Sequence, residues 1–139
     1  MTYSDALYQF WSSFTDDGAP IEAYLSGHIP DPSDVVFPYI TFENIQGAAF
    51  GRAPTMAFIW IQQGPGINVK EKREAFFAQV RAAIPESGRV LRYDGGMAVL
   101  YRDKNEFTKS YNPPDDEESV TAYPVRGGRV GYEIAFYGQ

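Results

Sequence analysis

Residues 55–63 read Thr-Met-Ala-Phe-Ile-Trp-Ile-Gln-Gln, and this stretch decides the fold class. Successive side chains of an extended strand point to opposite faces of a sheet. Apolar side chains occupy both faces here: Met56, Phe58 and Trp60 on one, and Ala57, Ile59 and Ile61 on the other. Such a strand is typical of the middle of a sheet, or of a sheet that is covered on both sides. We therefore expect a central strand in this segment.

A helix is expected before this strand, over residues 2–15. Its apolar side chains recur at i, i+3, i+4, i+7, i+8 and i+11, which places them on one helical face. They are Tyr3, Ala6, Leu7, Phe10, Trp11 and Phe14. Thr2 followed by Asp5 has the pattern of a capping box, and Asp-Asp-Gly at 16–18 is expected to end the helix.

A second helix is expected after the strand, over residues 69–83. Asn68 as the N-cap and Glu71 three residues later repeat the capping-box pattern, and Pro85 ends the helix. The apolar stripe of this helix consists of Val69, Phe76, Phe77, Val80, Ala83 and Ile84. The charged residues lie off the stripe, so this helix is expected to bury one face.

Four shorter segments have the patterns of strands. Asp-Gly-Gly at 94–96 lies between the last two of them and is a strong signal for a β-hairpin. The segments are 21–25, 39–45, 89–93 and 97–102.

The C-terminal third is expected to contain a long loop followed by a second hairpin. Residues 103–119 have no periodic pattern, contain two prolines and include four consecutive acids at 115–118. A segment of this length without secondary structure is usually functional or disordered. Strands over 119–125 and 129–137 are expected to pair around Arg-Gly-Gly at 126–128.

Together these segments predict an α+β fold that is formed by one domain, residues 1–139. The expected order is α-β-β-β-α-β-β-β-β, with the long acidic loop at 103–119. Neither a sequence repeat nor a βαβ alternation is present. The two helices are therefore expected to pack on one face of a largely antiparallel sheet.

The composition excludes several classes of protein. The chain has 139 residues, a formal net charge of −6, one histidine and no cysteine. It therefore has no disulfide framework, no thiolate zinc site and no thiol nucleophile. An acidic chain is a poor candidate for a nucleic-acid binder, and no apolar run approaches the ~18 residues that span a membrane. The first residues lack the basic start of a secretory signal, so we expect the protein to stay in the compartment where it is made.

Charge is distributed unevenly along the chain. Residues 1–51 contain seven acids and no Lys or Arg, and the first base is Arg52. Residues 52–139 contain 11 acids and 12 bases, which nearly cancel. This asymmetry indicates either that one surface of the fold is acidic or that the acids cluster in solvated loops.

No residue pattern in the sequence requires catalysis. The single histidine, His28, lies in a Pro/Gly loop, and no Gly-x-Ser-x-Gly nucleophile elbow is present. Gly-Pro-Gly at 64–66 precedes a helix, as a phosphate loop does, but the Walker pattern is absent. The four acids at 115–118 lack the alternating spacing and the glycine of a calcium loop. We expect no catalytic residue, no metal and no cofactor.

Six tyrosines remain outside the expected core, and many of them fall on outward faces of strands. They are Tyr39, Tyr93, Tyr101, Tyr111, Tyr123 and Tyr137. Exposed tyrosine is enriched at protein–protein contacts, so a cluster of them would suit subunit packing. The alternative is that both faces of the sheet are covered within one chain. The sequence leaves both possibilities open.

The segment around the second expected strand resembles a known family. A proline-rich loop, Pro-Asp-Pro-Ser-Asp at 30–34, leads into Phe-Pro-Tyr-Ile-Thr-Phe at 37–42. This is similar to the tail terminator (tail-completion) proteins of tailed bacteriophages, also called minor capsid or neck proteins. A Phe-Gly pair at 50–51, the strand that contains Trp60 and the aromatic-rich end of the chain follow in the same order. The acidic loop and the base-free N-terminal third depart from the family pattern.

The resemblance implies a structural virion protein without enzymatic activity, made in the host cytoplasm and located in the neck region of the tail. Such proteins are thought to assemble as homo-hexameric rings that cap the tail tube, stop its polymerisation and join it to the head. The implied partners are further copies of the chain, the major tail tube protein and the head–tail connector or stopper protein. DNA would pass through the lumen without specific binding, and no membrane is involved.

A closed ring needs two complementary surfaces on each subunit. An acidic surface is expected at Asp115, Asp116, Glu117 and Glu118, and a basic one that includes Arg89, Arg92, Arg102, Arg126 or Arg129. The base-free N-terminal third would suit an acidic lumen that repels DNA.

Three alternatives to the ring subunit remain. One is another neck or tail-completion component of the same fold. Another is a cytoplasmic α+β module that binds a small ligand in an aromatic pocket. The last is a small hydrolase that uses paired carboxylates.

Overall fold

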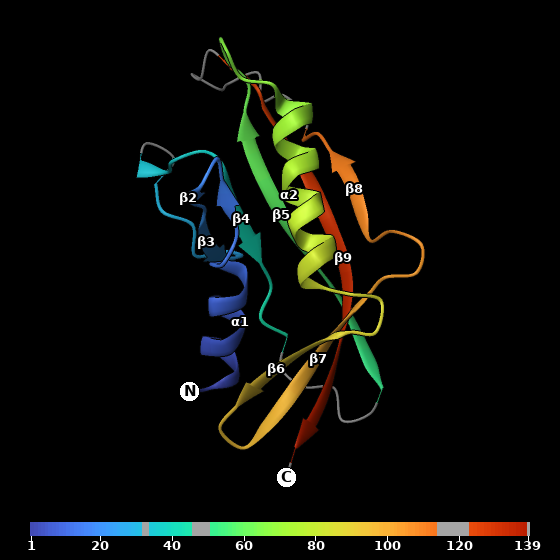
Figure 1. Ribbon diagram of the computed structural model, residues 1–139. Helices are drawn as coiled ribbons and strands as arrows, with labels where there is room; N and C mark the ends of the chain where they lie inside the picture. The colour runs from blue at the N-terminus through green and yellow to red at the C-terminus, as the bar shows by residue number, and fades with distance from the viewer. Residues whose placement is uncertain (32–33, 46–50, 114–122, 139) are drawn as a thin grey trace.

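The computed structural model describes residues 1–31, 34–45, 51–113 and 123–138 (Figure 1). Two helices are present in these residues, α1 (Tyr3–Trp11) and α2 (Val69–Ala83). The strands are β1 (Thr15–Asp16), β2 (Ala19–Pro20), β3 (Glu22–Leu25), β4 (Tyr39–Phe42), β5 (Arg52–Gln62), β6 (Arg89–Tyr93), β7 (Gly96–Arg102), β8 (Thr108–Tyr111) and β9 (Val125–Gly138).

The α+β class with two helices on a largely antiparallel sheet is confirmed. The main sheet has the strand order β3-β4-β5-β9-β7-β6, and β8 pairs with the first half of β9. Only β3 and β4 run parallel among the described pairs, so the sheet is mixed. β1 and β2 form a separate short hairpin.

The pairing of β5 with β9 forms the centre of the sheet. It runs without interruption from Arg52 opposite Ala135 to Gln62 opposite Val125. The odd-numbered residues of β5 from 55 to 61 are buried, whereas the even-numbered residues from 56 to 62 are half-buried. Three of these buried residues, Ala57, Ile59 and Ile61, belong to one core together with apolar residues of α1 and α2, so both helices lie on the same face of the sheet. The expectation of a central strand is confirmed, since β5 lies between β4 and β9, and no helix of the described residues lies against its other face.

Local signals account for both helices. The Thr2 hydroxyl accepts a hydrogen bond from the Asp5 backbone N–H, and the Asp5 carboxylate accepts one from the Thr2 N–H, both at 3.1 Å. This is the expected capping box. The Asn68 side chain caps α2 by accepting from the Glu71 N–H, also at 3.1 Å. Neither helix of the described residues is long and apolar enough to cross a membrane.

The first helix is shorter than expected because a hairpin follows it. α1 ends at Trp11, and Asp-Asp-Gly at 16–18 lies in the tight turn between β1 and β2 instead of ending the helix. Asp17 and Gly18 adopt positive φ angles of 50° and 83°, which such a turn requires. Phe14 remains in the core although it lies outside the helix.

The expected final hairpin is wrong, because residues 125–138 form the single strand β9. Gly127 and Gly128 lie inside this strand, where α2 packs closely on it. A Cβ atom on Gly128 would lie 2.5 Å from the Phe77 ring, and Arg73 donates a hydrogen bond to the Gly127 carbonyl at 3.1 Å. Glycine here allows a close approach of helix and strand, and it does not mark a turn.

The expected loop at 103–119 is also interrupted by structure. Residues 108–111 form β8, whose four residues pair with residues 127–130 of β9. Residues 103–107 lie beside Gly131, which exchanges backbone hydrogen bonds with Asp103 and Phe107. The acidic run at 115–118 lies outside the described residues.

We expect Gly128→Ala to destabilise the protein by about 1–3 kcal/mol, because the new methyl group overlaps the Phe77 ring. Gly64→Ala is the matched control, since a Cβ there would meet nothing nearer than Tyr123 at 3.8 Å. Urea unfolding of both variants measures the difference. Equal stability of the two would contradict the close packing of α2 on β9.

We also expect the protein to lose stability between pH 10 and 12. Burial raises the pKa of Tyr3 to about 12, and burial also raises the pKa of Tyr132. The folded state therefore binds these protons more tightly than the unfolded chain, in which tyrosine has a pKa of about 10. The stability that these two protonated tyrosines contribute is complete below pH 10, and it is lost as the pH rises through their pKa values in the folded state.

Tyr3→Phe tests this effect, because phenylalanine has no proton to lose. The variant should be about as stable as the wild type at pH 7 and should decline less steeply above pH 10. Tyr8→Phe, at an exposed position of the same helix, should keep the wild-type decline. Urea unfolding measures the free energy of unfolding across this pH range. An equal loss of stability above pH 10 in the wild type and in Tyr3→Phe would contradict the prediction.

Candidate interaction surface

The helix-free face of the sheet carries a cluster of six aromatic residues. β3, β4, β5 and β8 each contribute to it, and one member lies just before β4. We call it the aromatic cluster: Tyr24, Phe37, Tyr39, Phe58, Trp60 and Tyr111. The strand register brings these side chains together, because Tyr39 is opposite Trp60 and Tyr111 is opposite Gly127, the β9 partner of Trp60.

The rings form a continuous set of contacts. The ring centroid of Trp60 lies 5.3 Å from that of Phe58 and 5.8 Å from that of Tyr111. Tyr39 extends the set, with centroids 6.4 Å from Trp60 and 6.0 Å from Tyr24. Tyr111 is 38% exposed, and the other members are half-buried by one another. The protein therefore presents aromatic surface to solvent from β3 across β4, β5 and β9 to β8.

The indole N–H under this surface is satisfied within the chain. The indole N–H of Trp60 donates a hydrogen bond of 2.9 Å to the hydroxyl of Thr41, which is buried. Burial raises the pKa of Tyr39 above its usual value, so its hydroxyl stays protonated. A partner that covers Trp60 would therefore leave no indole donor without an acceptor.

Charged side chains occupy the same face beyond the aromatic cluster. Glu106 accepts hydrogen bonds from Arg129 and from Lys109, the latter at 3.3 Å. These cations hold the pKa of Glu106 below its usual value, with the Lys109 hydrogen bond as the largest cause. Arg52 lies 3.8 Å from Glu133 and stacks over the ring of Tyr101.

The structure divides the six tyrosines that the sequence singled out. Tyr39 and Tyr111 belong to the aromatic cluster, whereas Tyr101 and Tyr137 lie farther along the same face. Tyr93 lies on the helix side, with its ring centroid 5.6 Å from that of Tyr3. Tyr123 packs beside Gly64 at the end of β5.

Sequence reasoning missed Phe58 and Trp60 as surface residues because it assigned the aromatic residues of a central strand to the core. The apolar stripes indicate which side of each helix is buried, but they do not indicate which face of β5 the helices cover. That choice depends on which strands α1 and α2 contact, and these contacts are long-range.

The five arginines of the expected basic surface do not share one environment. Arg102 binds the end of α2, donating to the carbonyls of Ile84 at 2.7 Å and Arg81 at 2.9 Å. Arg89 and Arg92 are exposed on β6, Arg126 is half-buried near the start of β9, and Arg129 pairs with Glu106. Their expected acidic partners, Asp115 to Glu118, lie outside the described residues.

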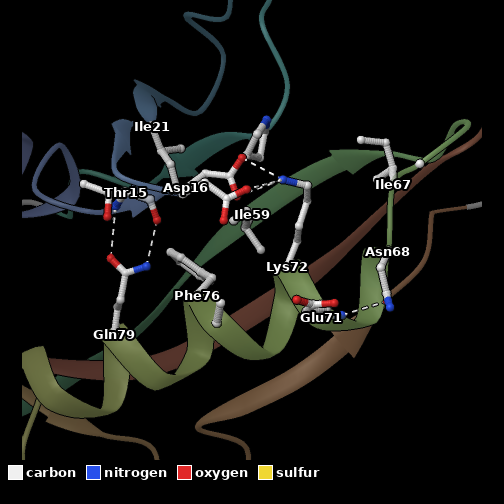
Figure 2. Close-up of a pocket in the computed structure, with 14 residues that line it drawn as sticks. Thr15, Asp16, Ile21, Ile59, Ile67, Asn68, Glu71, Lys72, Phe76 and Gln79 are labelled. Carbon is white, nitrogen blue, oxygen red and sulfur yellow. Dashed lines mark hydrogen bonds and ion pairs between the residues drawn. The ribbon is translucent and has the colours of Figure 1, made fainter.

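A cleft of about 360 Å³ lies on the other side of the molecule, between α2 and the β1–β2 hairpin (Figure 2). Its floor is apolar and includes Ile21, Ile59 and Phe76. Lys72 reaches across it from α2 and forms two hydrogen bonds of 2.9 and 3.0 Å with the Asp16 carboxylate. The Asp16 hydrogen bond is the main cause that raises the pKa of Lys72.

Gln79 fixes the hairpin to α2 at the other end of this cleft. Its side-chain oxygen accepts from the Thr15 N–H at 3.0 Å, and its side-chain nitrogen donates to the Thr15 carbonyl at 2.7 Å. Figure 2 shows these two contacts beside the Lys72–Asp16 pair. The walls of the cleft are thus held by ionic and polar contacts between segments far apart in the sequence.

His28 is exposed, and no group of three or more His, Asp or Glu within the described ranges is placed to hold a metal ion. Comparison with protein-family models, with curated proteins and with solved structures found no match.

We expect Gln79→Ala to destabilise the protein by about 1 kcal/mol, because it removes both hydrogen bonds to Thr15. Glu74→Ala, at an exposed position on the same helix, is the control and should change stability by less than about 0.5 kcal/mol. Chemical denaturation reports both values. The contact would be refuted if the two substitutions had equal effects.

Proposed function

We propose that this chain is a structural subunit that assembles with copies of itself into a ring, as a tail-terminator-like protein of a phage neck. In this role the ring caps the tail tube, stops its polymerisation and joins it to the head–tail connector. The observation that carries the proposal is the aromatic cluster on the helix-free face of the sheet.

Exposed aromatic surface of this kind is typical of protein–protein contacts. Contiguous apolar patches on the surface of a monomer mark interaction sites, and Tyr, Trp and Phe are enriched at interface cores. The rings of the aromatic cluster are already ordered by their neighbours, so little side-chain entropy is lost when a partner covers them. The Trp60–Thr41 hydrogen bond removes the cost of burying the indole N–H.

The resemblance to tail terminators and the aromatic cluster involve the same residues. The segment at 37–42 supplies Phe37 and Tyr39 to the cluster and Ile40 to the core. The part of the sequence that suggests the family is therefore also the part that forms the candidate contact. The number of six subunits, the tube and connector partners and the passage of DNA through the lumen rest on the resemblance alone.

The distribution of charge supports a head-to-tail contact. The base-free N-terminal third provides α1 and the β3–β4 end of the sheet. Lys109 lies on β8, which Figure 1 places on the opposite side of the molecule from α1, and Arg126 and Arg129 lie on the first half of β9, with which β8 pairs. Opposite charges on two flanks attract neighbouring copies, and a contact between different surfaces closes into a ring when its rotation closes.

Tyr111→Thr should weaken self-association by about tenfold or more, because it removes an exposed ring from the aromatic cluster while keeping a β-forming residue. Size-exclusion chromatography with light scattering over a concentration series measures the change in mass. Tyr8→Gln is the control, since Tyr8 is 48% exposed on α1 and lies outside the cluster. A wild-type protein that stays monomeric at every concentration would overturn the proposal.

A small-ligand-binding module is the second candidate, and the cleft beside α2 favours it. The cleft combines an apolar floor with an ion pair, as small-molecule sites often do. This candidate predicts a monomer whose ligand contacts Ile59 and Phe76, so the oligomeric state separates the two functions.

A further inference from the structure

A groove lies between α1 and the outer edge of β6, and none of the functions discussed above uses it. Its volume is about 310 Å³. Residues 89–92 of β6 line one wall, and Met1, Ala6 and Phe10 are among the residues that line the other. β6 is the last strand of the main sheet on this side, so no described strand pairs with its outer edge. The groove therefore combines an open sheet edge with one side of a helix.

The hairpin between β6 and β7 determines which backbone groups point to this open edge. Only two residues join the strands, so Tyr93 and Gly96 are the hydrogen-bonded pair that closes the hairpin. Hydrogen-bonded and non-hydrogen-bonded pairs alternate along an antiparallel ladder. Leu91 therefore bonds to β7, whereas the N–H and C=O groups of Val90 and Arg92 point away from it. The edge thus offers two donors and two acceptors to an added strand.

Met1 closes the groove at the turn after β6. Its carbonyl accepts a hydrogen bond of 2.8 Å from the N–H of Asp94, and its amino group pairs with the Asp94 carboxylate. A chain that enters the groove beside Met1 meets the free backbone groups of Arg92 first and those of Val90 next.

The side chains at this edge are basic and apolar. Arg89 lies on the α1 side, with its guanidinium 5.8 Å from the centroid of the Phe10 ring, and Leu91 is buried on the same side. Arg92 lies on the opposite face of β6, where it contacts the Met97 sulfur at 3.9 Å. Neither arginine forms an ion pair with a carboxylate of the described residues, and no Asp or Glu lines the groove. The edge therefore carries one positive charge on each face.

We infer that this edge binds an extended acidic segment of a partner protein, which joins the sheet as a strand beside β6. Addition of a strand to an exposed sheet edge is a recurring mode of peptide recognition. Main-chain hydrogen bonds then supply affinity, and alternate side chains supply specificity. The two arginines favour acidic partners, and they oppose the pairing of two β6 edges because like charges would meet.

The register of β6 defines the sequence pattern of that segment. Arg89 and Arg92 are three residues apart on opposite faces, so two carboxylates three residues apart in the added strand can lie beside both. The residue opposite Leu91 faces the α1 wall with Ala6 and Phe10, where an apolar side chain is favoured. The matching pattern is Glu-Val-Val-Glu, which reads the same in both directions and so fits a parallel or an antiparallel strand.

A fluorescent peptide, Thr-Glu-Val-Val-Glu-Thr with blocked ends, tests this contact on the full chain. The protein carries no N-terminal tag, because Met1 closes the groove. Fluorescence anisotropy at low ionic strength should show saturable binding that weakens as salt is added. The matched peptide Thr-Gln-Val-Val-Gln-Thr should bind about tenfold more weakly, since two charge pairs are lost. Absence of saturable binding by the acidic peptide overturns the inference.

Backbone methylation of the peptide distinguishes strand addition from attraction between charges alone. In an added strand, alternate N–H groups face β6 and the others face solvent. One peptide carries N-methyl groups on the first Glu and the second Val, and another carries them on the first Val and the second Glu. One of the two should lose binding, and the other should retain it. Equal binding of the two methylated peptides would exclude strand addition.

Variants of the protein locate the site. Arg89→Gln with Arg92→Gln should weaken binding of the acidic peptide about tenfold, whereas Lys70→Gln with Lys104→Gln removes the same charge from exposed positions elsewhere and should not. Val90→Pro removes a donor of the open edge and no hydrogen bond to β7, so it should abolish binding. Thermal unfolding verifies that each variant is folded. Equal binding by the two double variants would rule out this edge.

Light scattering with and without the peptide identifies the occupant. The peptide should leave the mass of the protein assembly unchanged, because β7 and β9 separate β6 from the aromatic cluster on β5. Dissociation of an oligomer by the peptide would show that a second copy occupies the edge, and it would overturn the assignment to a partner protein. Peptide binding by a chain that stays monomeric supports this inference, although the ring proposal then fails.

Discussion

The antiparallel pairing of β5 with β9 is the constraint on which the other features depend. Eleven consecutive residue pairs fix the register of these two strands, so every side chain on them is assigned to one face. Ile59 and Val130 face α1 and α2 and join the core, whereas Phe58 and Trp60 face away. A slip of one residue would exchange the two sets. The same pairing therefore forms the core and the aromatic cluster.

Both helices cover one face of the sheet, and this asymmetry leaves the aromatic cluster without a helix against it among the described residues. α2 can approach β9 because Gly128 lacks a side chain, and Phe77 fills the space above it. Nothing in the described chain covers Trp60 and its aromatic neighbours in the same way.

Local signals allowed much of this fold to be predicted. The 3.6-residue stripe located both helices, and Asn68 marked the start of α2 to the residue. The glycines at 127–128 were misleading, because a close helix–strand contact and a turn both require glycine, and only the tertiary structure distinguishes them. β8 lacks the apolar alternation that would predict a strand, and its extended conformation depends on its pairing with β9. The aromatic cluster combines residues from distant strands, so no local pattern could reveal it.

Electron microscopy of the purified protein tests most directly whether the chain works by assembling with itself. The proposal predicts annular particles of uniform diameter at concentrations where light scattering detects the oligomer. Those annuli should be lost when Tyr111 is replaced by threonine. Fields that contain only single subunits or irregular aggregates, at every concentration and ionic strength, would contradict it.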